Sequence, residues 1–154
     1  MANLVYNYFK KALLYGSFNL GGVGGTGGSV GGTLAPIYIA LVSNSYTPND
    51  DTDSYLSSLT NVVTPSNYVA YFALSSPQVL IDTGANIGVL DGSDILLANV
   101  TFATTVRACV LFGSSALGNA SSPLYAYVDF TTDQSVTAGT FQIQWNASGI
   151  LALT

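Results

Sequence analysis

The sequence of 154 residues contains no histidine and no glutamate. Histidine is the most common general base in enzymes and a frequent metal ligand, so its absence excludes a serine–histidine–aspartate triad. The acidic side chains are eight aspartates, and a hydrolase built on two of them would need both carboxylates close together. Nothing in their spacing brings two together in this way. We therefore expect no enzyme activity, no catalytic residues, no metal and no cofactor.

Charged side chains are scarce as well. They make up 7% of the residues, whereas a typical soluble domain has about 25%. The three basic residues are Lys10, Lys11 and Arg107, and the net charge is −5. Nucleic-acid binding needs clustered basic side chains, so we expect no nucleic-acid partner. So little charge leaves much neutral surface, which favours a chain that works packed against protein partners.

Cys109 is the single cysteine, which excludes an internal disulfide and a thiolate metal cluster. Its place in "VRACVLFG" predicts a small buried hydrophobic residue. No uniformly apolar run reaches the length of about 18 residues that predicts a membrane span. Lys10 and Lys11 lie inside the apolar N-terminal stretch rather than before it, unlike the charges of a secretory signal. We expect no membrane association.

Glycine is abundant in one place: residues 21–32, "GGVGGTGGSVGG", hold eight of the 16 glycines. A phosphate-binding loop would need a lysine after the glycines, and both lysines precede them. A dinucleotide loop would leave a strand and open a helix, whereas this run follows a helix-like segment. Collagen would need glycine at every third position. The composition predicts a flexible connector over residues 21–34.

Residues 1–20 are predicted to form a helical arm, with Asn3 as a possible N-cap and Gly16 as a stop. Residues 35–154 are predicted to form an antiparallel β-domain, a sandwich or a barrel-like fold, because short β-branched and aromatic runs alternate with turn residues. The expected strands are 37–42, 68–73, 78–82, 95–101, 106–112, 124–130, 141–146 and 150–153. The fold class is therefore mainly β, and we expect the β-domain to fold without residues 1–32.

Two aspartate-rich segments are predicted to form turns. "PNDDTD", with Asp50, Asp51 and Asp53, faintly resembles a calcium loop, but it lacks the glycine and glutamate of an EF-hand. A solvated turn before a short helix in "DTDSYLSSL" is the alternative. "LDGSD" reads as a hairpin turn because of its Asp-Gly pair. Arg107 could anchor a carboxylate of a partner or pair within the fold.

The segment "TFQIQW" alternates apolar and polar residues, so Phe141, Ile143 and Trp145 are expected to share one face of a strand and point inward. We also expect a β-bulge near Gly139, in "VTAGTF".

Four segments in order resemble a family of small virion structural proteins of tailed bacteriophages. They are "LLYGSFNL", "IYIALVSNSYTPNDDTDSYLSSL", "VTFATTVRACVLFG" and "PLYAYVDFTTDQSVTAGTFQIQWNASGILALT". The last is the most specific, with its Asp-Gln-x-Val-Thr turn and its strand ending in Trp before Gly-Ile-Leu. The resemblance covers nearly the whole chain except residues 21–32, which look like an insertion, and it is weak over "NVVTPSNYVAYFALSSP".

The resemblance implies a location on the virion, assembled in the bacterial host cytoplasm, as a head decoration or cement subunit. The expected partners are the major capsid protein and copies of the chain itself, with a trimer as the expected oligomer. The glycine run would let the N-terminal helix reach a neighbouring subunit. The candidate interface residues are Tyr6, Tyr8, Phe9, Leu13, Tyr46 and Tyr55. The alternative is a tail- or fibre-associated adaptor, or a receptor- or glycan-binding module that uses exposed aromatic side chains such as Tyr46 and Tyr55.

Overall fold

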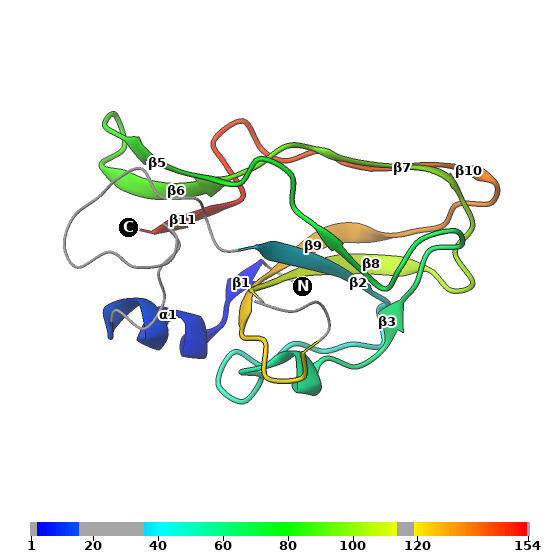
Figure 1. Cartoon of the computed structure of the whole chain (residues 1–154), viewed down its shortest axis with the longest axis horizontal. Helices are drawn as coiled ribbons and strands as arrows, with labels where there is room; N and C mark the ends of the chain where they lie inside the picture. Colours follow the sequence, from blue (N-terminus) through cyan, green and yellow to red (C-terminus); the bar gives the residue numbers. More distant parts are fainter. Residues whose placement is uncertain (1–2, 16–35, 114–118, 154) are drawn as a thin grey trace.

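The computed structural model describes residues 3–15, 36–113 and 119–153. The chain is mainly β, and its antiparallel sheets form a sandwich-like fold rather than a closed barrel (Figure 1). This confirms the predicted fold class. The predicted connector over residues 21–34 lies outside the described residues. No described helix is long and apolar enough to cross a membrane.

One layer of the sandwich is a six-stranded sheet with the order β1-β9-β8-β2-β3, in which β4 also pairs with β2. Its strands are β1 (Leu4–Val5), β2 (Ile37–Val42), β3 (Val62–Val63), β4 (Tyr71–Ala73), β8 (Val106–Gly113) and β9 (Leu124–Gln134). Strands β2, β8 and β9 are the long central members, and each pair between them is antiparallel.

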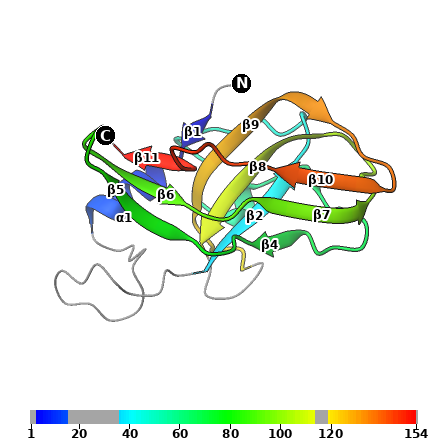
Figure 2. The same ribbon diagram turned by 90° about the horizontal axis from the view of Figure 1, so that it is seen from above.

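The other layer consists of two smaller sheets that lie over the larger one (Figures 1 and 2). One sheet pairs β7 (Ile95–Val100) with β10 (Gly139–Ile143). The other has the order β11-β6-β5, formed by β5 (Gln78–Asp82), β6 (Ile87–Asp91) and β11 (Leu151–Leu153). The register of β10 against β7 shifts between Gly139 and Phe141. Over this stretch β10 advances two residues and β7 advances three, from Leu97 to Val100, so the extra residue lies in β7 and not in "VTAGTF", where the bulge was predicted.

The larger sheet is buried on both faces. Between the layers, Ile39, Leu41 and Cys109 belong to one hydrophobic cluster together with residues of β7, β10 and β11. On the opposite face, Ala40 and Val110 belong to a second cluster that is covered by the N-terminal segment and the loop after β2. Because both faces of the sheet are buried, the sequences of the central strands are unbroken apolar runs and do not alternate between apolar and polar residues. Cys109 is fully buried, as predicted, and burial raises the pKa of its thiol.

The N-terminal segment packs on the β-domain of its own chain, which corrects its interpretation as an outward-reaching arm. The helix is α1 (Asn7–Leu14), and the residues before it form β1, which pairs with β9. The ring of Phe9 is fully buried and stacks on Tyr125 with 4.4 Å between ring centroids. Asn3 does not cap the helix; its side-chain oxygen accepts the backbone N–H of Asp129. Burial of Phe9 makes α1 part of the core.

A buried chain of hydroxyl groups fixes the same segment to the loop after β2. The Tyr6 and Tyr46 hydroxyls are 2.9 Å apart, and the Tyr46 hydroxyl donates to a carboxylate oxygen of Asp53 at 2.8 Å. Burial raises the pKa of both tyrosines, so both phenols stay protonated near neutral pH. Asp53 also accepts the backbone N–H of Asn49, so this carboxylate stabilises the turn in which it lies.

Several local predictions need correction. The expected helix in "DTDSYLSSL" is reduced to the 3-10 helix η1 (Leu56–Ser58), which has no side-chain cap. The segment "LDGSD" is not a hairpin turn, because it connects β6 and β7, which belong to different sheets. Strands β1, β3 and β6 were not predicted. Most of the other strands lie where the sequence places them, with ends that differ by a few residues.

Replacing Phe9 with alanine tests whether α1 belongs to the core. We expect Phe9→Ala to lower the free energy of unfolding by about 3–5 kcal/mol, because the substitution leaves a cavity beside Tyr125. Leu14→Ala, at a side chain of the same helix that is 90% exposed, is the control, with a change of about 0.5 kcal/mol or less. Urea unfolding followed by circular dichroism measures both. Equal stability of the two variants would show that the helix is a dispensable arm.

Candidate functional site

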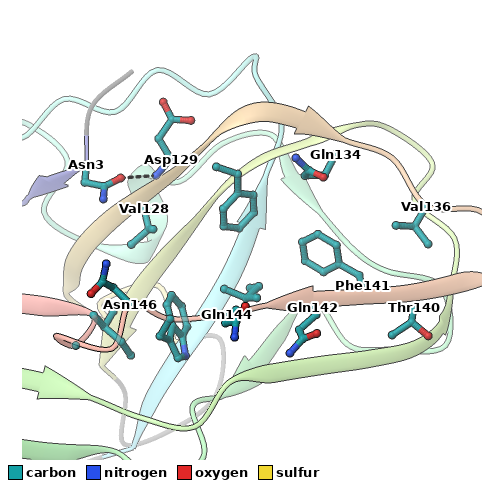
Figure 3. Close-up of a pocket in the computed structure, with 15 residues that line it drawn as sticks. Asn3, Val128, Asp129, Gln134, Val136, Thr140, Phe141, Gln142, Gln144 and Asn146 are labelled. Atoms are coloured by element: carbon teal, nitrogen blue, oxygen red, sulfur yellow. Dashed lines mark hydrogen bonds between the residues drawn. The ribbon is translucent and has the colours of Figure 1, made fainter.

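A groove of about 590 Å³ opens between the two layers, at the side of the sandwich formed by β9 and β10. Figure 3 shows side chains from both strands and from the segment after β10 converging on it. Strands β9 and β10 follow each other in sequence but belong to different sheets. The groove therefore marks a place where the sandwich is not closed.

The floor of the groove is apolar. Phe141 and Ile143 are buried on the inward face of β10, and Val128 and Phe130 of β9 pack against the same core cluster. Trp145 is half-buried and packs there too. Phe141, Ile143 and Trp145 therefore share the inward face, as the alternation in "TFQIQW" predicts.

The rim of the groove is polar and uncharged. Its side chains are those of Asn3, Gln134, Thr140, Gln142, Gln144 and Asn146. Among the described lining residues, Asp129 is the one ionisable group. Its side chain points away from the groove floor (Figure 3) and pairs with Arg107. The groove thus offers amides, a hydroxyl and apolar surface, a combination that suits a neutral ligand or an extended peptide.

Two strand edges open onto this groove. Within the described chain β10 pairs only with β7, and β1 pairs with β9 only at Ala126 and Tyr127, so the rest of β9 has no strand on that side. The outer edge of β7, in contrast, is covered by side chains. The hydroxyl of Tyr68 accepts the Ala98 N–H at 3.0 Å and lies 3.3 Å from the Ala98 carbonyl oxygen. On β9 the N–H groups of Asp129 and Thr131 are already bonded to side chains, so the edge of β10 is the one that is left for a partner strand within the described chain.

Trp145, which lines the groove, is hydrogen-bonded to the segment between β6 and β7. Its indole Nε1 donates to the Ser93 carbonyl oxygen at 3.0 Å, and its backbone N–H donates to Asp94 Oδ1 at 2.9 Å. These bonds link the segment after β10 to the connection between the smaller sheets. They hold the end of the groove that contains Asn146.

Beside the groove, β9 contains a large bulge centred on Phe130–Asp133. From Val106 to Ala108, β8 advances two residues, while the facing part of β9 advances five, from Asp129 to Gln134. Thr131 within it has a φ of 65°, an unusual conformation for a β-branched residue. The bulge bends the strand and re-aims its side chains.

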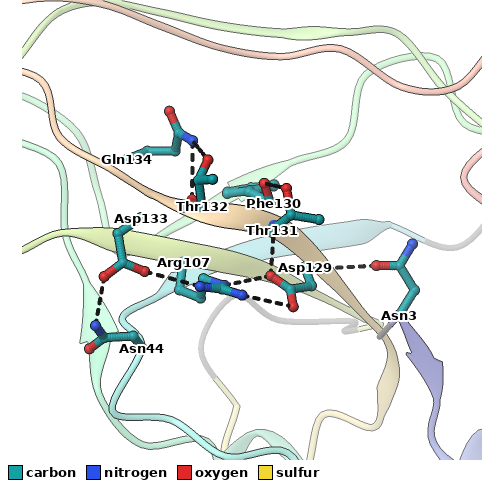
Figure 4. A network of polar contacts seen from close by, with 9 residues as sticks. All are labelled: Asn3, Asn44, Arg107, Asp129, Phe130, Thr131, Thr132, Asp133 and Gln134. Carbon is teal, nitrogen blue, oxygen red and sulfur yellow. Dashed lines mark hydrogen bonds and ion pairs between the residues drawn. The ribbon is translucent and has the colours of Figure 1, made fainter. Parts of the chain in front are cut away.

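Arg107 fills the space opposite this bulge (Figure 4). Its Nε is 2.6 Å from Asp129 Oδ1, and its Nη1 is 3.5 Å from Asp133 Oδ1. Asp133 in turn accepts a hydrogen bond from Asn44 at 2.6 Å, and Asp129 accepts the backbone N–H of Thr131. Arg107 therefore pairs within the fold, which was one of the two alternatives for this residue.

The hydrogen bonds from Arg107 lower the pKa of Asp129 to about 2, against the opposing effect of burial, and the Thr131 amide acts in the same direction. Asp129 is the buried partner, with 1% of its side chain exposed, while Arg107 is 26% exposed. The pair orients the bulge of β9 and does not present a free charge to the groove.

The candidate interface residues from the sequence do not gather at one surface. Tyr6, Phe9 and Tyr46 are buried in the core of their own chain, which leaves them no surface for a partner in this conformation and corrects their assignment. Tyr8, Leu13 and Tyr55 are half-buried, and the rings of Tyr8 and Tyr55 lie 4.7 Å apart. Tyr46 is therefore unsuited to stacking on a glycan. Sequence reasoning missed the groove, although the alternating glutamines of "TFQIQW" are its rim.

Two aspartates of "PNDDTD" accept hydrogen bonds within the fold. Asp51 accepts a hydrogen bond from the side chain of Asn7, and Asp53 accepts those of Tyr46 and Asn49. In the part of the chain that the structure describes, no three acidic or cysteine side chains are placed to hold a metal ion.

Comparisons with protein-family models, with curated proteins and with solved structures gave no match for this chain. Its function is therefore inferred from its own residues.

The Arg107–Asp129 pair predicts how stability depends on pH. Because the carboxyl pKa falls from about 3.9 in the unfolded chain to about 2 in the folded one, its contribution is complete above about pH 4 and is lost as the pH falls through about 2. The free energy of unfolding of wild type should therefore converge on that of Asp129→Asn as the pH is lowered from 5 to 2. Asp133→Asn, which removes the longer contact, is the control and should keep the pH dependence. A constant difference between wild type and Asp129→Asn would contradict the assignment.

Proposed function

We propose that this chain is a structural virion protein of a tailed bacteriophage, a capsid decoration or cement protein that binds and stabilises the shell. The sequence resemblance supports this role, and one structural observation carries it: an uncharged groove with an apolar floor, bordered by unpaired strand edges. Such a surface binds through apolar and main-chain contacts. The chain has few basic residues with which to form ion pairs to an acidic partner.

The groove suits an extended segment of the major capsid protein. A segment that adds to the free edge of β10 forms main-chain hydrogen bonds, and every second side chain points the same way. One set of those side chains would enter the groove over Phe130 and Phe141, while the other set faces water beside Gln142 and Gln144. This mode of binding gives affinity without ion pairs.

The titratable groups of the described residues support binding in preference to catalysis. Burial raises the pKa of Cys109, Tyr6 and Tyr46, so none of them gives up its proton readily near neutral pH. Asp129 is ionised and held by Arg107. General acid–base catalysis works best when a group titrates near the working pH, and these groups titrate far from it.

A glycan-binding module at the tail or on a fibre is the second candidate. The observation that favours it is the same rim of amide side chains next to Trp145, because amides bind hydroxyl groups and an aromatic face packs on a sugar ring. In this case the ligand would be a neutral polyhydroxylated compound. Labelled particles distinguish the two functions: density over the shell supports decoration, and density at the tail tip supports the module.

Attachment to purified particles tests the decoration role. The wild-type chain should stay on the shell after a wash at about 1 M salt, because screening at a Debye length near 3 Å weakens only charge pairs. The double variant Thr140→Lys/Gln142→Lys, at two exposed rim positions, should lower occupancy at every salt concentration, since charged side chains beside the edge of β10 oppose strand addition.

The matched control is Ser57→Lys/Thr64→Lys, which adds the same charge at exposed positions outside the groove. It should attach like wild type, as judged by gel analysis of washed particles. Release of the wild type at high salt, or full occupancy of the groove variant, would count against the proposed role.

A further inference from the structure

Strand β5 carries a second exposed feature, far from the groove. It is an edge strand of the three-stranded sheet, and within the described chain it pairs only with β6. All five of its residues are exposed, including three consecutive apolar side chains: Val79 at 48%, Leu80 at 45% and Ile81 at 74%. Because successive side chains point to opposite faces of a strand, apolar surface is exposed on both faces.

The hairpin that presents β5 is well formed. Asp82 Oδ1 accepts the backbone N–H groups of Gly84 and Ala85 at 2.9 and 3.0 Å, and Asn86 takes a positive φ of 56° in the turn. A strand held in this way loses little conformational freedom on pairing. Figure 2 shows β5 at the margin of the smaller sheet, beyond β6.

We propose that β5 pairs antiparallel with β5 of a second copy of this chain across a two-fold axis, with Leu80 opposite Leu80. An exposed apolar edge strand is a template for strand pairing, and charged or proline residues normally protect such edges. Here Asp82 is the one charged residue in the strand. The inference goes beyond the shell-binding role, because the occupant of this edge is the chain itself.

The sequence of β5 is complementary to itself in this register. Gln78 faces Asp82 of the second copy, so an amide meets a carboxylate at each end, and Val79 faces Ile81. The two Asp82 residues are then four positions apart along the strands, roughly 14 Å at 3.4 Å per residue. That exceeds the Debye length of about 8 Å at physiological ionic strength, so their repulsion is screened.

Other registers of the β5 pair are less favourable. A shift that centres the pair on Asp82 sets two carboxylates directly opposite each other, which destabilises antiparallel strands. It also leaves Gln78, Val79, Leu80 and Ile81 without a facing residue of the strand. Only the register centred on Leu80 pairs all five residues. An isologous contact of this kind closes with two copies, so it gives a dimer and not the trimer expected for the family.

A charge exchange tests the facing pair of Val79 and Ile81. Val79→Lys and Ile81→Asp should each weaken dimerisation by roughly tenfold or more, since each puts two charges against apolar residues. An equimolar mixture should regain the dimer, because the introduced lysine of one chain then faces the introduced aspartate of the other, while the remaining Val–Ile pair is intact. Analytical ultracentrifugation of each variant and of the mixture measures this. Both positions are exposed, so the fold is unaffected.

A cysteine at the centre tests the symmetry. Facing residues of antiparallel strands have Cα atoms about 4.5–5.5 Å apart, within disulfide range. Leu80→Cys should therefore give a covalently linked dimer under mild oxidation. Cys109 is fully buried and does not compete. Leu96→Cys, at a leucine of β7 that is 63% exposed, is the matched control and should stay monomeric on a non-reducing gel.

A wild-type chain that is monomeric or trimeric in ultracentrifugation would overturn the inference. A dimer that is not restored in the mixture, or that Leu80→Cys does not link, would overturn it equally. None of these measurements uses virions, so a failure of the dimer is distinguishable from a failure of the shell-binding role.

Discussion

Burial of β2, β8 and β9 on both faces is the constraint on which the rest of the structure depends. A sheet that is apolar on two sides needs two covers, and the chain supplies them from different places. The smaller sheets cover one face, and the N-terminal segment with the loop after β2 covers the other. This arrangement explains why Tyr6 is buried, and why the Tyr6–Tyr46–Asp53 hydrogen bonds lie where they do, because they hold the N-terminal segment against the loop after β2. Phe9 belongs to the cluster between the layers.

The local sequence pattern was enough to predict the antiparallel β fold and most strands. Runs of β-branched and aromatic residues between turn residues favour extended strands whatever the rest of the chain does. The local pattern failed where contacts between distant segments decide the conformation or the partner of a strand. Leu4 and Val5 continue a helical pattern, yet they pair with β9 because its edge is available there. The Asp-Gly pair after β6 is typical of hairpins, but β7 pairs with β10, and no local signal gives the partner of a strand. The inward direction of Phe141, Ile143 and Trp145 was predictable because it needs only the period of two.

The candidate site was less predictable than the fold. The lining residues of the groove range from Asn3 to Ile150, and the groove exists because β1 stops after two residues and β10 has a single neighbour. Where strands stop pairing is a property of the assembled sheets. Similarly, Arg107 meets Asp129 and Asp133 only because the bulge in β9 inserts residues opposite it. The alternating glutamines of "TFQIQW" predict an exposed face of the chain, but they do not predict the groove next to it.

Charge and topology together limit how this chain can associate. Arg107 is engaged by two aspartates, so among the described residues Lys10 and Lys11 remain to attract an acidic partner. This scarcity of positive charge is in keeping with the proposed association through apolar contacts and backbone groups. Two edges with such groups in the smaller layer are that of β10, beside an apolar groove, and that of β5, between exposed apolar side chains. Because the two edges belong to different sheets, the proposed shell contact and the proposed pairing of β5 use separate surfaces.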